Sequence, residues 1–162
     1  MSGWDGYIYQ IQNVYDATTQ TYKKTNVCEH AAIYGMDGTL WAGSAGFTLT
    51  KYAHEITLED GTKKKVNVDE FKTALEATKG NRKPSEAGIR MNNQKYMFIQ
   101  HNPGSDSVYL AREGGGGACV CRTKTAVIIG VWHKGTAMSD GLLQNQGDCN
   151  ENTEKVAEFL KG

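Results

Sequence analysis

The sequence has no excess of charge of either sign and no long apolar run. Its 18 basic and 18 acidic side chains cancel over 162 residues. General binding to nucleic acid or to an anionic membrane needs a positive field, so this balance argues against both. No apolar run approaches the roughly 20 residues that cross a bilayer, and the N-terminus lacks the zones of a signal peptide. We therefore expect a cytoplasmic protein with a single domain over residues 1–162.

The sequence also lacks the spacing of a metal centre and any catalytic signature. Cys119 and Cys121 are separated by one residue, whereas structural zinc sites place about two to four residues between paired cysteines and add a second pair. Alternate cysteines on a strand share a face and behave as small hydrophobes. With Cys28 and Cys149 they are expected to be free thiols in a reducing compartment. No nucleophile or carboxylate pair has a suitable neighbour, so we predict no catalytic residue, metal or cofactor.

Short apolar runs separated by turn residues dominate the second half of the chain. They cover residues 95–100, 107–112, 118–123 and 126–131, and are rich in β-branched and aromatic residues. Such runs predict a four-stranded antiparallel meander. The glycines at 114–117 precede a strand and not a helix, which favours a turn over a phosphate-binding loop.

The remaining segments predict three helices and two hairpins. The helices cover 3–15, 69–79 and 150–161, the first with Ser2 as its N-cap and the second ended by Gly80. One hairpin joins 27–34 to 39–42, and another lies within 47–68, turns at 59–62 and carries lysines 63–65 on a solvated edge. Segments 16–26 and 133–148 are expected to be loops. The whole is an α+β fold around one antiparallel sheet.

Four aromatic residues stand out because two of them lie near the very start of the chain, where full burial is rare. Trp4 and Tyr7 share a helix face, Trp41 follows a hairpin turn, and Phe159 lies on the last helix. If the terminal helices lie side by side, these rings form one exposed patch. Such patches bind polyproline helices, because Tyr and Trp donate hydrogen bonds to the free carbonyls. The alternative is that the rings belong to the ordinary core.

Several motifs, taken in order, resemble the profilin family. They are the opening S-G-W-D-G-Y-I, the hairpin A-A-I-Y-G-M-D-G-T-L-W-A, the strand K-Y-M-F-I-Q before N-P-G, the later G-G, R-T and I-I-G, and the closing C-N with the aromatic-Leu pair at 159–160. The resemblance covers about 150 residues. It implies a central antiparallel sheet, with both terminal helices on one face and smaller helices on the other.

The resemblance also implies two binding surfaces in a non-enzymatic regulator of actin polymerisation, associated with the cytoskeleton and monomeric. The first binds proline-rich proteins such as formins through Trp4, Tyr7, Trp41 and Phe159, and the second binds monomeric actin through Lys95, Arg112 and Asn150. Profilins also bind phosphoinositide lipids at membrane surfaces, and the matching basic residues are Arg112, Arg122 and Lys124.

Two segments depart from the family pattern. Residues 47–68 are expected to add a hairpin, and 133–148 are expected to form a longer loop beside the expected actin surface. Two alternatives therefore stay open. One is a polyproline-binding adaptor with little or no actin binding, and the other is a small sensor or enzyme domain on a similar sheet.

Overall fold

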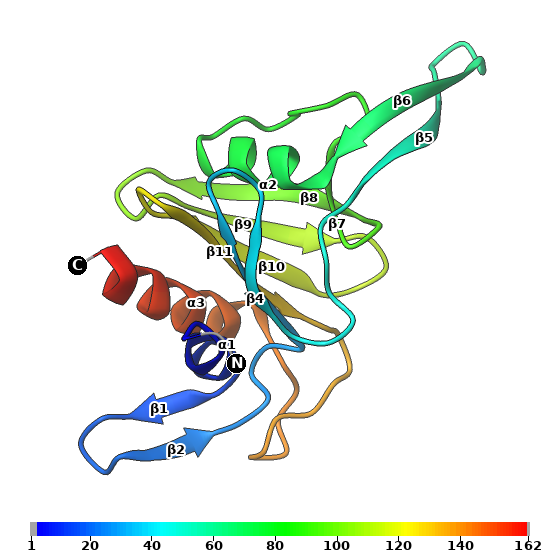
Figure 1. Cartoon of the computed structure of the whole chain (residues 1–162). Coiled ribbons are helices and arrows are strands. Elements are labelled where there is room, and N and C mark those ends of the chain that lie inside the picture. The colour runs from blue at the N-terminus through cyan, green and yellow to red at the C-terminus, as the bar shows by residue number, and fades with distance from the viewer. Residues whose placement is uncertain (1–2, 162) are drawn as a thin grey trace.

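The computed structural model describes residues 3–161 and is built around a seven-stranded antiparallel sheet in the order β4-β3-β11-β10-β9-β8-β7 (Figure 1). The strands of this sheet are β3 (His30–Gly35), β4 (Leu40–Gly43), β7 (Ile89–Met91), β8 (Gln94–Asn102), β9 (Ser107–Arg112), β10 (Gly117–Arg122) and β11 (Ala126–Trp132). Two further hairpins, β1 (Val14–Asp16) with β2 (Thr21–Lys24) and β5 (Lys51–Thr57) with β6 (Lys63–Asp69), form separate two-stranded sheets.

Helices cover both faces of the large sheet. The terminal helices α1 (Asp5–Gln12) and α3 (Gln146–Lys161) lie side by side on one face, and α2 (Glu70–Thr78) lies on the other (Figure 1). Alternation along the strands divides the core accordingly. Ile128 and Cys119 pack under the terminal helices, whereas Ile129 and Val120 pack under α2. This confirms the predicted α+β arrangement, although α2 is the one helix that residues 3–161 place on the second face.

The predicted meander is confirmed as β8 to β11, and in the sheet it is flanked by the β3–β4 hairpin on one side and by β7 on the other. β11 pairs with β3, so that Ile128 lies opposite Ile33 and the first hairpin completes the sheet. β7 pairs with the start of β8, with Ile89 opposite Tyr96. β7 was not predicted, because three residues between turns are too few to show a period. The β3–β11 pairing is non-local, so no short-range pattern predicts it.

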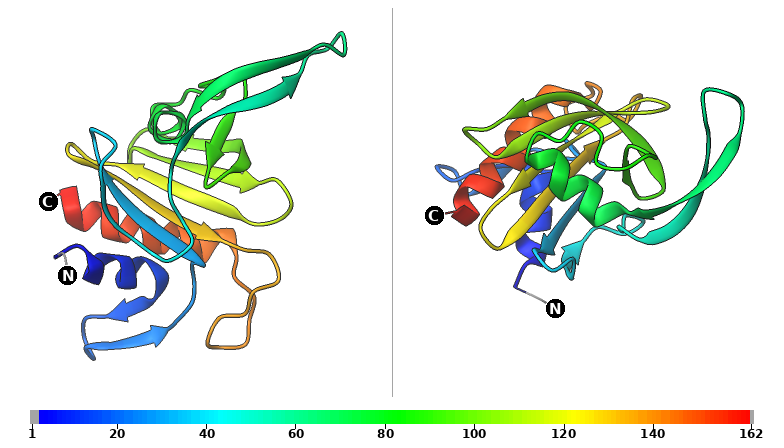
Figure 2. Two further views of the ribbon diagram at one scale, coloured as in Figure 1. Left: turned by 45° about the vertical axis from the view of Figure 1, so that its right-hand side comes forward. Right: turned by 90° about the horizontal axis from the view of Figure 1, so that it is seen from above.

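The N-terminal segment differs from the prediction in two ways. The first helix covers Asp5–Gln12 and not 3–15, and its expected cap Ser2 lies outside the described residues. The expected loop at 16–26 contains the β1–β2 hairpin, which lies beyond α1 on the side away from the sheet (Figure 2). Its cross-strand pair Tyr15 and Tyr22 stabilises it. The sequence did not predict this hairpin, because the threonine-rich segment between the two tyrosines is typical of a loop.

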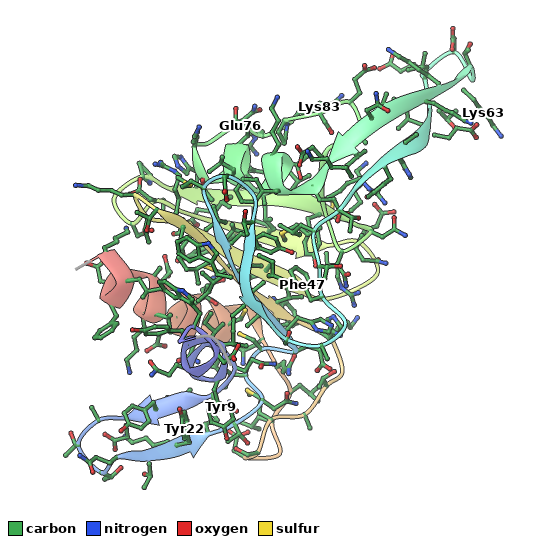
Figure 3. The ribbon with its side chains drawn as sticks, viewed as in Figure 1. Tyr9, Tyr22, Phe47, Lys63, Glu76 and Lys83 are labelled. Atoms are coloured by element: carbon green, nitrogen blue, oxygen red, sulfur yellow. The ribbon has the colours of Figure 1, made fainter. Side chains whose placement is uncertain are left out.

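The β5–β6 hairpin, which is the one expected within residues 47–68, projects from the sheet as an arm (Figures 1 and 2). Its turn uses the predicted residues, since the backbone N–H of Leu58 donates to the carbonyl of Thr62 at 2.7 Å. Lysines 63–65 are exposed, as predicted for a solvated edge, and Lys63 lies near the far end of the arm (Figure 3). The following helix α2 begins at its N-cap Asp69, whose side chain accepts a hydrogen bond from the N–H of Lys72.

The C-terminal helix begins at Gln146, four residues before the predicted start at 150. Asn145 explains the difference, since its side-chain oxygen accepts a hydrogen bond from the backbone N–H of Asp148 at 2.8 Å and caps the first turn. The four cysteines are buried free thiols in the core between the sheet and the terminal helices, with Cys149 on α3 itself, which confirms their prediction as small hydrophobes. No helix within residues 3–161 is long and apolar enough to cross a membrane.

Candidate binding surfaces

The four predicted aromatic residues form one continuous series of rings, which we call the aromatic patch. The Trp4 ring lies 4.7 Å from that of Trp41 and 5.6 Å from that of Tyr7, centroid to centroid. Tyr7 lies 6.0 Å from Phe159 across the contact between α1 and α3. Phe159 is 70% exposed, and the other three rings are half-buried. The structure therefore confirms the predicted juxtaposition of these rings.

A glycine on β3 shapes one end of the aromatic patch. A Cβ added at Gly35 would lie 2.7 Å from Trp41 Nε1 and 2.8 Å from Trp41 Cε2. Only a residue without a side chain leaves room for the indole to lie over the strand at this position. Gly35 is thus a functional candidate that the sequence analysis missed, although it precedes the predicted Met36-Asp37-Gly38 turn.

A second surface lies on β8 and β9, on the sheet face that carries α1 and α3 but beyond the reach of these helices. Lys95, Met97 and Ile99 are exposed along β8, and Met97 and Ile99 are 55% and 52% exposed. Met97 pairs with Ala111 on β9, and Lys95 accepts a backbone hydrogen bond from Glu113. We call Lys95, Met97, Ile99, Ala111 and Glu113 the β8–β9 face. Adjacent exposed apolar residues with charged neighbours are typical of protein-binding surfaces.

Arg112, which the resemblance pairs with Lys95, lies on the opposite side of the sheet. It is directly across from the buried Tyr96, so strand alternation separates it from Lys95. Its Nε donates to the carbonyl of Gly115 at 3.0 Å and stabilises the turn before β10. Arg112 and Lys95 therefore lie near the same turn but face different directions.

Arg112 has two histidine neighbours at its end of the sheet. The His30 and His133 rings make an edge contact with centroids 5.3 Å apart, and His30 also stacks on Phe47 at 5.6 Å. Burial lowers the pKa of both histidines, and the positive charge of Arg112 lowers them further, while Glu29 opposes the shift. Sequence patterns gave no indication of this cluster, because His30 and His133 meet only through the β3–β11 pairing.

Asn150, the third residue expected to contact actin, is 9% exposed. Its side-chain oxygen accepts a hydrogen bond from Gln146, whose own oxygen accepts one from Trp132 Nε1 at 3.0 Å. Asn150 therefore orients Gln146 at the start of α3 and has little surface of its own to offer a partner.

The basic residues expected to bind phosphoinositides do not form one cluster. Arg112 lies near the start of β10, whereas Arg122 is the last residue of that strand and Lys124 follows it. Arg122 and Lys124 instead line a cleft of about 410 Å³ with Lys161 and Asp106. Asp106 lies 3.2 Å from the Arg122 guanidinium and 3.6 Å from Lys161, so part of the positive charge is already neutralised.

Within residues 3–161 no group of three or more His, Cys, Asp or Glu side chains is placed to hold a metal ion. What the structure does present is an antiparallel sheet with both terminal helices on one face and two separate partly apolar surfaces. This combination defines a small α+β domain with two candidate binding surfaces.

The chain belongs to the profilin family. The family model described as Profilin matches residues 3–162. A profilin of Tetrahymena pyriformis is 34% identical over 164 residues, which cover 99% of this chain and 97% of the relative.

Solved profilin structures share the fold at lower identity. LokiProfilin2 in complex with rabbit actin has a TM-score of 0.63 at 14% identity and covers 99% of this chain and 98% of its own. Mouse profilin IIa, in complex with a double repeat from the FH1 domain of mDia1, has a TM-score of 0.58 at 16% identity, with 99% and 97% covered.

Proposed function

We propose that this protein binds monomeric actin and proline-rich segments at two separate surfaces and regulates actin polymerisation without acting as an enzyme. The observation that carries the proposal is the aromatic patch, whose four rings come from the N-cap and first turn of α1, from β4 and from α3. A flat, partly exposed series of rings suits a polyproline helix, which is already ordered and loses little entropy on binding. The FH1 repeat in the mouse profilin IIa complex supports this choice of ligand.

The β8–β9 face is the proposed actin surface. Its exposed Met97 and Ile99 supply apolar contact area, and Lys95 supplies a charge at its edge. Arg112 lies near the same turn but on the opposite side of the sheet, so it would extend this surface around the end of the sheet, and Asn150 would act through its hydrogen bond to Gln146. The rabbit actin complex of LokiProfilin2 supports an actin partner. In this proposal the chain works in the cytosol as a monomer and as one domain.

Actin assembly tests the proposal most directly. Rising amounts of the protein are expected to slow spontaneous assembly, because bound monomers do not nucleate. Lys95→Glu is expected to weaken this effect, whereas Lys65→Glu, with the same charge change on the exposed arm, is expected to leave it intact. Unchanged assembly at saturating protein, with a normal circular dichroism spectrum, would rule out actin binding.

A polyproline-binding adaptor without actin binding is the second candidate, and the position of the arm favours it. The arm residues His54 and Ile56 line a groove of about 550 Å³ together with Lys95. The arm therefore lies beside one edge of the β8–β9 face and can restrict access to it. This candidate predicts that proline-rich peptides bind while actin assembly stays unchanged.

Phosphoinositide binding is the least supported part of the proposal. Arg122, Lys124 and Lys161 would contact the headgroup without Arg112, and they would have to compete with Asp106 for it. Binding to vesicles with and without phosphoinositide, repeated with Lys124→Glu, distinguishes a headgroup site from general attraction to an anionic surface.

A further inference from the structure

A groove adjoins the aromatic patch at its Phe159 end. It has a volume of about 530 Å³ and lies between α1, the β1–β2 hairpin and α3. Its lining residues are Gln10, Tyr15, Ala17, Asn152, Lys155, Val156, Glu158 and Phe159. Because Phe159 belongs both to this groove and to the aromatic patch, the two form one continuous surface.

The floor and walls of the groove suit an apolar occupant. Val156 forms part of the floor, and the side-chain NH₂ of Asn152 is already bonded to the carbonyls of Gln10 and Ile11 at 2.8 and 2.7 Å. That amide group therefore needs no further acceptor from a ligand. Lys155 and Glu158 stand at the rim with opposite charges, so the groove selects for neither sign.

The β1–β2 hairpin holds the wall of the groove in place. The Tyr15 ring packs edge-on against Tyr22 at 5.1 Å, and Tyr22 packs edge-on against Tyr9 of α1 at 4.7 Å. Figure 3 shows Tyr9 and Tyr22 between α1 and this hairpin. The Lys155 ammonium group also donates to the Tyr15 carbonyl at 3.4 Å. A wall fixed before binding loses little entropy when a ligand arrives.

We infer that this groove binds an apolar side chain from the residues that flank the proline tract of the same ligand. The inference rests on the proposed polyproline site and deepens it. A polyproline helix on the aromatic patch that passes Phe159 brings its next residues directly over the groove. The groove then gives this protein a preference among proline-rich partners, which the rings alone do not provide.

Peptide binding measured by fluorescence anisotropy tests the inference. The probes are tracts of about ten prolines with two leucines or two serines added at either end. We expect the wild type to bind one of the leucine forms about tenfold more tightly than its serine counterpart, since one buried apolar side chain contributes that much. Equal affinity for the leucine and serine forms at both ends would overturn the inference while leaving the polyproline site intact.

A matched pair of variants locates the preference. Ala17→Arg places a long side chain in the groove, and Thr18→Arg adds the same charge at the next exposed position, outside it. Ala17→Arg is expected to abolish the leucine preference and to leave affinity for the serine form unchanged, and Thr18→Arg is expected to change neither. A preference that survives Ala17→Arg would overturn the inference.

Two further outcomes would also count against it. If no peptide binds the wild type, the proposed polyproline function fails and the inference fails with it. If sedimentation shows a wild-type dimer that Ala17→Arg dissociates, the occupant of the groove is a second copy of this chain.

Discussion

At the scale of single residues, Gly35 on β3 determines where the Trp41 indole ring lies. Its missing side chain leaves the space that the Trp41 indole occupies, 2.7 Å from where a Cβ would stand. Gly35→Ala is therefore expected to displace the indole and to weaken polyproline binding by about tenfold, the effect of losing one contact residue. Peptide titration followed by tryptophan fluorescence measures this.

Gly43→Ala on the neighbouring strand is the matched control for Gly35→Ala. Its Cβ would meet Leu40 at 3.4 Å, an ordinary contact, so binding is expected to stay normal. Equal losses of affinity in both variants would show that any alanine in this hairpin disturbs the patch, and that Trp41 is not held specifically by Gly35.

The pair of His30 and His133 predicts a pH dependence of stability. Burial, aided by Arg112, lowers the pKa of both from the ordinary 6.5, and the Glu29 charge only partly opposes this. The unfolded chain therefore binds protons at a higher pH than the folded one. The associated stability is present above about pH 6.5 and is lost as the pH falls below it.

Thermal unfolding between about pH 7 and about pH 5 checks this prediction. His133→Gln is expected to flatten the fall in melting temperature, whereas His54→Gln on the arm is expected to leave it unchanged. Asp37 and Asp148 do not contribute to this fall, since hydrogen bonds lower their pKa from the ordinary 3.8, which is already below this pH range. An unaltered slope in His133→Gln would contradict the assignment.

At the scale of elements, Glu70 joins the arm to the sheet. It is fully buried at the start of α2 and accepts hydrogen bonds from the N–H of Thr50 at 3.0 Å, the hydroxyl of Tyr52 at 2.8 Å and the N–H of Asn93 at 2.7 Å. The Tyr52 hydroxyl also accepts a bond from Arg90. One carboxylate thus fixes the base of β5 against the β7–β8 turn.

Glu70→Ala is expected to lower the free energy of unfolding by about 3 kcal/mol, because it removes the fully buried acceptor of three hydrogen bonds and leaves their partly buried donors unpaired. Glu76→Ala is the control on the same helix. Glu76 forms a partly exposed pair with Lys79 at 3.2 Å, so its loss is expected to cost less than about 1 kcal/mol. Urea unfolding of both variants measures the difference, and equal costs would show that the network does not anchor the arm.

The elements also show what the sequence can and cannot predict. The meander, the arm turn and α2 were predicted because each has a local signal, such as Asp69 before α2 and Gly80 after it. β7 and the β1–β2 hairpin were missed because their stability comes from tertiary neighbours, as when Tyr22 packs on Tyr9. The start of α3 was predictable in retrospect, since Asn145 is a good N-cap residue.

For the binding surfaces, too, the sequence predicts what local patterns encode and misses what strand pairing decides. The four rings of the aromatic patch were predicted from the helix period and from the resemblance to profilins, and they do lie together. Strand pairing decides the remaining positions. The register of β8 on β9 sets Arg112 across from Tyr96 and away from Lys95. The order of β9 and β10 separates Arg112 from Arg122. No spacing along the chain contains this information.

At the scale of the whole molecule, the two proposed surfaces use different elements. The aromatic patch is formed by residues at α1, β4 and α3. The β8–β9 face lies toward the opposite end of the strand order, since β4 is the first strand of the sheet and β9, β8 and β7 are the last three. From this separation we predict that both ligands bind at the same time. Saturating actin is expected to leave the affinity for a proline-rich peptide unchanged, and competition between them would show that the two ligands share one surface.

Simultaneous binding at the two proposed surfaces would change where actin monomers are delivered. A proline-rich tract fixed near a filament end holds the loaded protein there, so the local monomer concentration rises without any new contact to the filament. We expect filaments whose ends carry such a tract to elongate faster with wild-type protein, as seen by single-filament microscopy.

Phe159→Ala removes the most exposed ring of the patch and is expected to abolish this acceleration while still slowing spontaneous assembly. Lys95→Glu is expected to weaken both effects, because an unloaded protein has nothing to deliver. If Phe159→Ala accelerates elongation as the wild type does, the tract is not bound through the aromatic patch.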